Sequence, residues 1–387
     1  MNIKDQILEC ASGSRASGED FAFSSSSDDV RENFLNSIRD FLGAKTYIEA
    51  ERRCRELYAH ILTLHDKYPI LFPTIDRLNV EELYGAYGYK ERRLHFCHQA
   101  NVFLLGLYIY HNFEPLREQI KSEMQKTTAT ITRNYPYRPF KYSGESEYGE
   151  FLYRWRLAAL CHDIGTGIQN CEGKEEKFSE CLSHLSFENQ VKSLDQLYNI
   201  GNCHLLHELD RTCDEVSLSE YMEYQNSNPF PDSVYHDHGI VGALIFFRLI
   251  HEEYARHSET PISQTRFGKV FWHPDILSHS ILQITIAIAM HNLETHKKAL
   301  QTCAKNVRLF DMYKRPLAWL LKMTDLLQEW DKPQREEERN EVFSTDLRLN
   351  VSRSGITVKN FPKDRLQNAQ IFLEYYMNPQ DIIAFEH

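Results

Sequence analysis

The adjacent residues His162 and Asp163 lie at the end of an apolar segment, and this placement constrains the fold strongly. The five residues before the pair, Leu157 to Cys161, are Leu-Ala-Ala-Leu-Cys, and Ile164 follows it. Burying an imidazole and a carboxylate in such surroundings costs free energy unless a partner compensates their polarity. A divalent cation would provide that compensation. The pair therefore predicts a metal site at the end of a buried helix.

Four further residues of metal-binding type stand in apolar segments of helical periodicity, far apart in the chain. Any one of them is explained more simply as a buried structural residue, because the chain has 18 histidines. Taken together they point to a helical bundle, since only a bundle gathers single ligands from five separate helices. Imidazole and carboxylate ligands suit Mn, Fe, Co, Ni or Zn, and Mg is a further candidate. The candidate metal ligands are His98, His162, Asp163, His238, His291 and Asp325.

The spacing of the apolar residues predicts an all-α fold, a helical bundle with a small C-terminal β-hairpin appendage. Asp237 is expected to cap one helix and Pro316 to begin another. Alternation between 341 and 361, with the turn residues Ser352 to Gly355, predicts the hairpin. A polar stretch is expected after residue 112, with Pro136 and Pro139 in a loop. Helices are expected within 30–65, within 80–112 in two pieces, and over 151–162, 238–256, 276–291, 316–330 and 364–377.

Composition changes along the chain divide it into four expected regions. Residues 1–29 are rich in Ser, Gly and Asp after a short helical start, which is typical of a flexible segment. Residues 30–79 form an N-terminal helical region, and residues 80–335 form the core that holds the candidate ligands. Residues 168–232 of that core resemble an insertion that could cover a site. Residues 336–387 form the appendage.

Composition and charge exclude several classes of protein. Hydrophobic residues make up 42% of the 387 residues, which is too many for a disordered chain. The formal charge of −11 disfavours a nucleic-acid partner and an anionic membrane surface. Nine cysteines without a Cys-x-x-Cys pair exclude a zinc ribbon and, with no secretory leader, predict reduced thiols. We expect a cytoplasmic protein that does not associate with membranes.

The order His, His-Asp, His, His, Asp resembles that of the HD superfamily of metal-dependent phosphohydrolases, in particular its bacterial-type members. The resemblance covers about residues 90–332, and the His162-Asp163 dyad gives this superfamily its name. The segment beginning His162-Asp163-Ile164-Gly165 is similar to the family motif His-Asp-Ile-Gly-Lys, with Thr166 in place of the usual Lys. The Gly-Tyr-Pro motif of the cyclic-dinucleotide branch is absent after His291.

The resemblance implies a site with two divalent cations and a phosphate ester, in the first place a nucleotide, as substrate. Asp163 would bridge the two cations and so serve catalysis directly. The first cation would bind His98, His162 and Asp325, and the second would bind His238 and His291. Two cations close together activate a bridging water and neutralise the oxygens of an in-line phosphoryl displacement.

The substrate contacts are less constrained, because each candidate is explained more simply as a solvated surface charge. Phosphate recognition needs Arg or Lys at the rim of the site. Arg92 and Arg93 precede the His98 segment, and Lys322 lies one helical turn before Asp325. The candidate general acid is His236, with His296 and Glu294 as alternatives.

Three functions fit these features. The first is a nucleotide-directed phosphohydrolase that cleaves a phosphomonoester or phosphodiester, or removes triphosphate from a deoxynucleotide. The second is a metal-containing sensor or binding module without turnover, although such a module has no need of all six ligands. The third is a single-strand nuclease, which the net charge of −11 disfavours.

Overall fold

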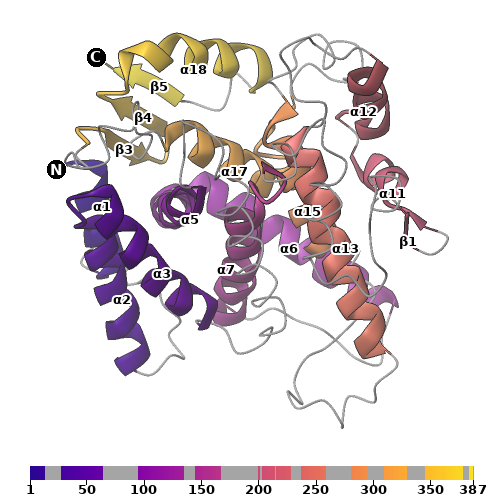
Figure 1. Cartoon of the computed structure of the whole chain (residues 1–387), viewed down its shortest axis with the longest axis horizontal. Helices are drawn as coiled ribbons and strands as arrows, with labels where there is room; N and C mark the ends of the chain where they lie inside the picture. Colours follow the sequence, from indigo (N-terminus) through magenta and orange to yellow (C-terminus); the bar gives the residue numbers. More distant parts are fainter. Residues whose placement is uncertain are drawn as a thin grey trace. The chain divides into compact units, whose positions relative to one another are not determined.

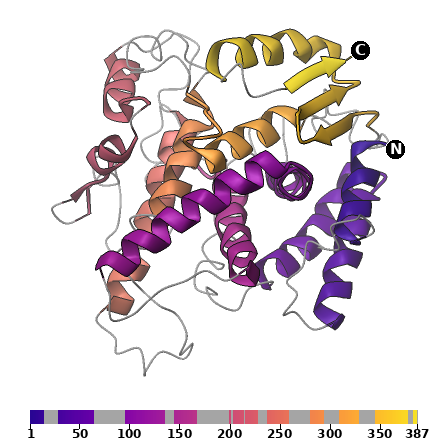
Figure 2. The ribbon, with the colours of Figure 1, turned by 180° about the vertical axis from the view of Figure 1, so that it is seen from behind.

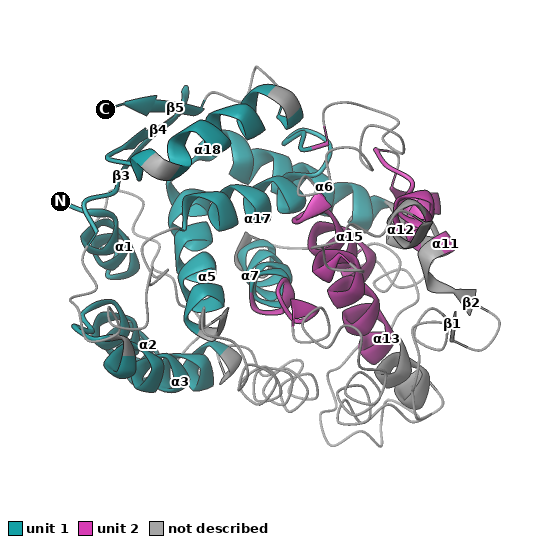
Figure 3. Cartoon of the chain, turned by 45° about the horizontal axis from the view of Figure 1, so that its top comes forward, with its two compact units in different colours: residues 1–66, 90–159, 310–387 teal, residues 67–89, 160–309 magenta. Residues whose placement is uncertain are grey.

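The computed structural model describes most of the chain, which divides into two compact units (Figure 3). Unit 1 comprises residues 1–66, 90–159 and 310–387, and unit 2 comprises residues 67–89 and 160–309. Each unit is described by itself. The described residues are 1–13, 28–63, 95–134, 144–166, 199–200, 203–213, 215–227, 237–258, 280–293, 309–328, 345–377 and 383–386.

Unit 1 is built mainly of helices, as the apolar periodicity predicts. The buried residues of these helices are spaced three or four apart, so each helix has one apolar face that packs on its neighbours. Helix α5 packs against α1, α3, α6 and α17. None of the helices that the structure describes is long and apolar enough to cross a bilayer. The helices are α1 (Ile3–Ala11), α2 (Asp28–Leu42), α3 (Tyr47–Thr63), α5 (His95–Asn112), α6 (Glu114–Asn134), α7 (Gly144–Cys161, whose last two residues belong to unit 2), α17 (Pro316–Leu327) and α18 (Lys363–Tyr376).

Helices α5 and α7 are in contact through one aromatic side chain. The indole of Trp155 lies against Gly106 and donates a hydrogen bond to the carbonyl of Phe103 at 2.9 Å. A Cβ atom at Gly106 would lie 2.0 Å from the Trp155 ring, so only glycine fits at this crossing. The contact joins α7 to α5 within unit 1.

Helix α6 corrects the expectation of a polar stretch after residue 112. It runs from Glu114 to Asn134, and Leu116, Ile120 and Met124 are buried at intervals of four residues. The helix also packs against α17, as Figure 2 shows. This apolar stripe is narrow and is surrounded by many charged residues. The average hydrophobicity of the segment is therefore low, and it does not predict a buried helix.

The C-terminal part of unit 1 contains the expected hairpin and one strand that was not expected. Strands β3 (Arg348–Ser352) and β4 (Gly355–Lys359) pair antiparallel, with Ser352 opposite Gly355. Strand β5 (Ile383–Glu386) adds to β4 in parallel, and α18 lies alongside the sheet (Figure 1). Gln6 of α1 satisfies the backbone of Leu349, accepting its N–H at 3.1 Å and donating to its carbonyl at 2.9 Å. The appendage is therefore a three-stranded sheet joined to the first helix.

In unit 2, two apolar helices pack against each other. Helix α13 (His238–Ser258) packs against α15 (Leu282–Met290). Gly239 allows this close approach, because a Cβ there would lie 3.0 Å from the carbonyl of Ile288. The expected helices over 238–256 and 276–291 are thus confirmed in their described parts. Within the expected insertion lie the two-residue strands β1 (Asn199–Ile200) and β2 (Cys203–His204) and the helices α11 (Leu205–Thr212) and α12 (Leu218–Ser227).

Unit 1 also contains a buried histidine that predicts a pH dependence of stability. Burial, with the nearby charge of Arg117, lowers the pKa of His111 from 6.5 to about 4. The unfolded chain therefore binds more protons between these values, so this residue's contribution is complete above pH 6.5 and is lost as the pH falls toward 4. The full loss is about 3 kcal/mol. Urea unfolding from pH 7 to 4 should show a smaller loss for His111→Gln than for the wild type, and equal losses would contradict this.

Candidate metal centre

Three side chains of unit 2 converge on one point. The Oδ1 atom of Asp163 lies 3.3 Å from Nε2 of His238 and 3.5 Å from Nε2 of His291. The two Nε2 atoms are 3.2 Å apart. Asp163 and His291 are buried, and the His238 side chain is 17% exposed. The three ligand atoms lie within the reach of a single ion.

These separations match the ligands of one small cation. Two atoms bound to a transition metal at about 2.1 Å lie about 3.0 Å apart at a right angle and about 3.4 Å apart at the tetrahedral angle. Without a cation, the contact between His238 and His291 is favourable only as a hydrogen bond, in which one Nε2 atom carries a proton and the other does not. Two imidazoles and one carboxylate form a donor set that Mn, Fe, Co, Ni and Zn accept.

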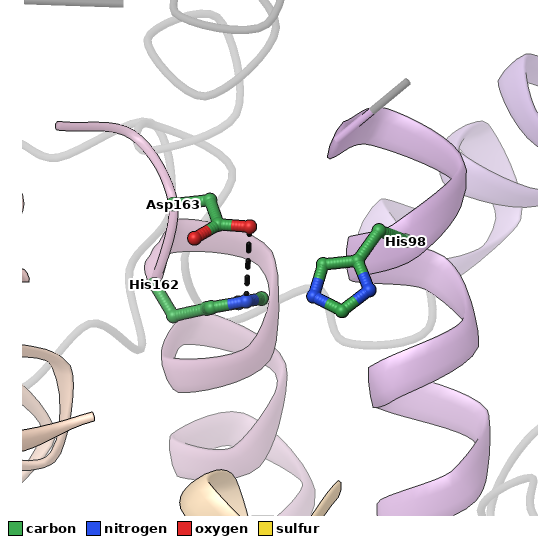
Figure 4. A group of neighbouring side chains, drawn as sticks. All are labelled: His98, His162 and Asp163. Atoms are coloured by element: carbon green, nitrogen blue, oxygen red, sulfur yellow. Dashed lines mark ion pairs between the residues drawn. The ribbon is translucent and has the colours of Figure 1, made fainter. Parts of the chain in front are cut away.

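The second oxygen of Asp163 faces the other residue of the dyad. Its Oδ2 atom lies 3.2 Å from Nε2 of His162, an ion pair drawn in Figure 4, which also draws His98 of unit 1. The ring of His162 meets the ring of His291 edge to face, with centroids 5.0 Å apart. The carboxylate therefore directs one oxygen to His238 and His291 and the other to His162. A carboxylate with divided contacts of this kind is suited to bridging two cations.

The electrostatics favour the protonation states that metal ligands require. Burial opposes ionisation of Asp163, but the charge of His162 and hydrogen bonds from His162, His238 and His291 outweigh it and hold its pKa well below the usual range. Burial lowers the pKa of His291, and the charges of His162 and His238 lower it further against the opposing effect of Asp163. An ionised carboxylate beside a neutral imidazole is the form that binds a cation.

A second layer of polar residues in unit 2 supports the ligands. Oδ1 of Asp237 caps α13 by accepting from the backbone N–H groups of Gly239 and Ile240, which confirms the expected cap. Its Oδ2 accepts from Tyr221 at 3.4 Å and from Asn292 at 3.2 Å. The reading of the sequence missed Tyr221 and Asn292. Only the position of Asn292, directly after His291, could have suggested it.

Asn292 and a backbone carbonyl determine which histidine nitrogens face Asp163. Nδ2 of Asn292 lies 3.2 Å from Nδ1 of His238, and Nδ1 of His291 donates to the carbonyl of Ile288 at 2.6 Å. Both Nδ1 atoms are thereby occupied, and both Nε2 atoms face the carboxylate. The bond from Nδ1 of His291 to a backbone carbonyl is the arrangement that commonly holds metal-binding histidines. The amide N–H of Asn292 instead makes Nδ1 of His238 an acceptor, so a cation at Nε2 of His238 would have to displace the proton of that nitrogen.

The dyad is brought to α13 by a close backbone contact. After α7 ends at Cys161, a turn forms in which the N–H of Thr166 donates to the carbonyl of Asp163 at 2.9 Å. A Cβ atom at Gly165 would lie 2.0 Å from the carbonyl oxygen of His238. Glycine is therefore required at this position by the space available.

In unit 1, His98 and Asp325 also form a pair. Nε2 of His98 lies 3.0 Å from Oδ1 of Asp325, and the His98 side chain is fully buried. The Nδ1 atom of His98 contacts Oε1 of Gln328, a residue that the sequence reading missed. Lys322 is buried, with Nζ 3.9 Å from Oδ2 of Asp325 and 5.0 Å from the centre of the Phe372 ring.

Several candidate residues cannot be placed. The predicted phosphate contacts Arg92 and Arg93 lie outside the described residues, as do the candidate general acid His236 and its alternatives His296 and Glu294. Their roles stay predictions. Of the predicted phosphate contacts, Lys322 alone lies in the part of the chain that the structure describes.

The comparisons with known proteins give no match that assigns a function to the candidate centre. No model of a protein family matches the chain, and searches of curated proteins and of solved structures find no match either. The resemblance to the HD superfamily therefore stays a prediction that rests on the order and local context of its six residues.

Proposed function

We propose that this protein is a metal-dependent phosphohydrolase that acts on a phosphate ester, a nucleotide in the first place. The observation that carries the proposal is the convergence of Asp163, His238 and His291, with separations of 3.2 to 3.5 Å between their ligand atoms. Two imidazoles and one carboxylate, largely buried and this close together, form a donor set that divalent transition-metal ions accept. A function that uses a bound cation accounts for their convergence.

The residues present fit a divalent cation, and Asp163, His238 and His291 would hold it. When bound, such a cation acidifies water and stabilises the charge that develops on phosphoryl oxygens. Asn292 and the carbonyl of Ile288 orient the two imidazoles. Asp163 contributes the negative charge of the centre and, through its second oxygen, orients His162.

The proposal extends to a second cation held by His98, His162 and Asp325, as the superfamily resemblance implies. Its support within unit 1 is the pairing of the buried His98 with Asp325 at 3.0 Å. Arg92, Arg93 and Lys322 are proposed to bind the substrate phosphate, and His236 is proposed to protonate the leaving oxygen.

The test is a combined measurement of metal binding and turnover. Metal-free protein is titrated with Mn²⁺, Co²⁺, Ni²⁺, Zn²⁺ and Mg²⁺, and each form is incubated with nucleoside mono-, di- and triphosphates, deoxynucleotides and a single-stranded oligonucleotide. We expect release of phosphate, pyrophosphate or triphosphate, and its loss in His291→Ala. The exposed His207→Ala, on α11 of the same unit, serves as the control. Metal binding without any product would overturn the enzymatic proposal and leave a metal-binding module.

A further inference from the structure

Gln328 follows the last residue of α17, and its side chain turns back into unit 1. Its backbone N–H donates to the carbonyl of Thr324 at 2.9 Å, and the residue has no exposed surface. Its Oε1 atom contacts Nδ1 of His98. A glutamine without exposed surface needs an explanation, because polar side chains are seldom buried without full hydrogen bonding.

The two ends of this amide differ in their partners. Nε2 of Gln328 makes no hydrogen bond to any residue that the structure describes. A buried donor without a partner lowers stability, and an apolar side chain of the same shape would avoid that cost. A contribution to stability therefore does not explain why a glutamine occupies this position. An apolar residue could not make the contact of Oε1 with His98.

The chemistry of the contact determines the tautomer of His98. An amide oxygen can only accept a hydrogen bond, so Nδ1 of His98 must carry the proton. The other nitrogen, Nε2, lies 3.0 Å from Oδ1 of Asp325, which is also an acceptor, so in the metal-free protein a proton lies between them that a cation would replace. Without Gln328 no acceptor would keep a proton on Nδ1, and the ring would hold its single proton on Nε2, which would then have no lone pair for a cation.

We propose that Gln328 is a positioning residue that keeps a proton on Nδ1 of His98, so that Nε2 is the nitrogen that exchanges its proton for a divalent cation bound together with Asp325. The inference rests on the proposed function for the identity of the ligand, but the proton on Nδ1 is a property of the metal-free protein. Residues that hold metal-binding histidines from behind commonly change metal affinity when they are replaced.

The experiment compares Gln328→Met, which keeps the shape but lacks an acceptor at that point, with Gln328→Glu, which restores an acceptor. Thr324→Val, a buried change on α17 that leaves His98 untouched, is the matched control. Histidine ¹⁵N NMR spectra of the metal-free proteins report the tautomer of His98, assigned with His98→Ala. Mn²⁺ titration reports affinity, and urea unfolding reports stability.

We expect Gln328→Met to shift His98 to the Nε2-protonated tautomer and to weaken the affinity for Mn²⁺ about 10- to 100-fold. Its unfolding midpoint should not fall, and Gln328→Glu should restore the tautomer. A purely structural role predicts the reverse, a lower midpoint with an unchanged tautomer, and that result would overturn the inference. If the wild type and His98→Ala bound Mn²⁺ equally, the proposal that His98 binds a second cation would be wrong. The NMR result would still decide whether Gln328 controls the protonation of His98.

Discussion

Asp163→Asn is expected to abolish the metal binding proposed for the unit 2 centre and, with it, the proposed turnover. The substitution keeps the shape of the side chain but removes the negative charge that faces His162, His238 and His291. It also replaces one ligand oxygen with an amide nitrogen that cannot bind a cation. We expect metal affinity to fall by more than about 100-fold, beyond the loss typical for an outer supporting residue. Metal content after dialysis, measured by elemental analysis, checks this.

A matched variant separates this effect from a general change of charge. Asp346→Asn removes one negative charge from an exposed position of unit 1 and should leave metal content and turnover at the wild-type level. Asp163→Asn protein that still retained stoichiometric metal would show that the carboxylate is a structural residue. The three histidines would then need another explanation for their convergence.

Gly165→Ala disrupts the same centre without touching a ligand. The added methyl group would lie 2.0 Å from the carbonyl oxygen of His238 and 2.7 Å from the backbone nitrogen of Gly242. Both neighbours are backbone atoms, so the turn that carries the dyad must move away from α13. We expect a loss of about 1–3 kcal/mol in the free energy of unfolding, as for other overpacked sites, together with weakened metal binding. Urea unfolding of metal-free protein and Mn²⁺ titration measure the two effects.

Gly242→Ala provides a graded comparison at the other side of this contact. Its Cβ would lie 3.1 Å from the nitrogen of Gly165, a distance that a small adjustment can relieve. The loss of stability should therefore be clearly smaller than for Gly165→Ala. Equal losses for the two substitutions would mean that the close approach of Gly165 to α13 does not control the stability of this region.

The helices that the sequence predicted correctly are those with broad apolar faces. Helix α13 has apolar residues on most of its first fourteen positions, and α17 begins at Pro316 as expected. Helix α6 was missed because its buried stripe is one residue wide. Strand β5 was missed because four residues with alternating exposure become a strand only through pairing with β4, a contact that no local pattern encodes.

The supporting residues of the centre were harder to predict than the ligands. His238 and His291 stand out because an imidazole interrupts an apolar segment, and this signal is local. Asn292 and Gln328 are ordinary polar residues at helix ends, where amides are common for reasons unrelated to function. Their contacts with histidines depend on which neighbouring helix each end meets.

Local chemistry along the chain was thus sufficient to indicate a helical protein with six candidate ligands, because periodicity and the cost of burying polar groups act over a few residues. Tertiary packing decided which ligands meet within each unit and which nitrogen each presents. Within unit 2, the close contact of Gly165 with His238 and of Gly239 with Ile288 brings the dyad turn, α13 and α15 together. These are contacts between residues more than forty positions apart, so a one-dimensional pattern carries no record of them.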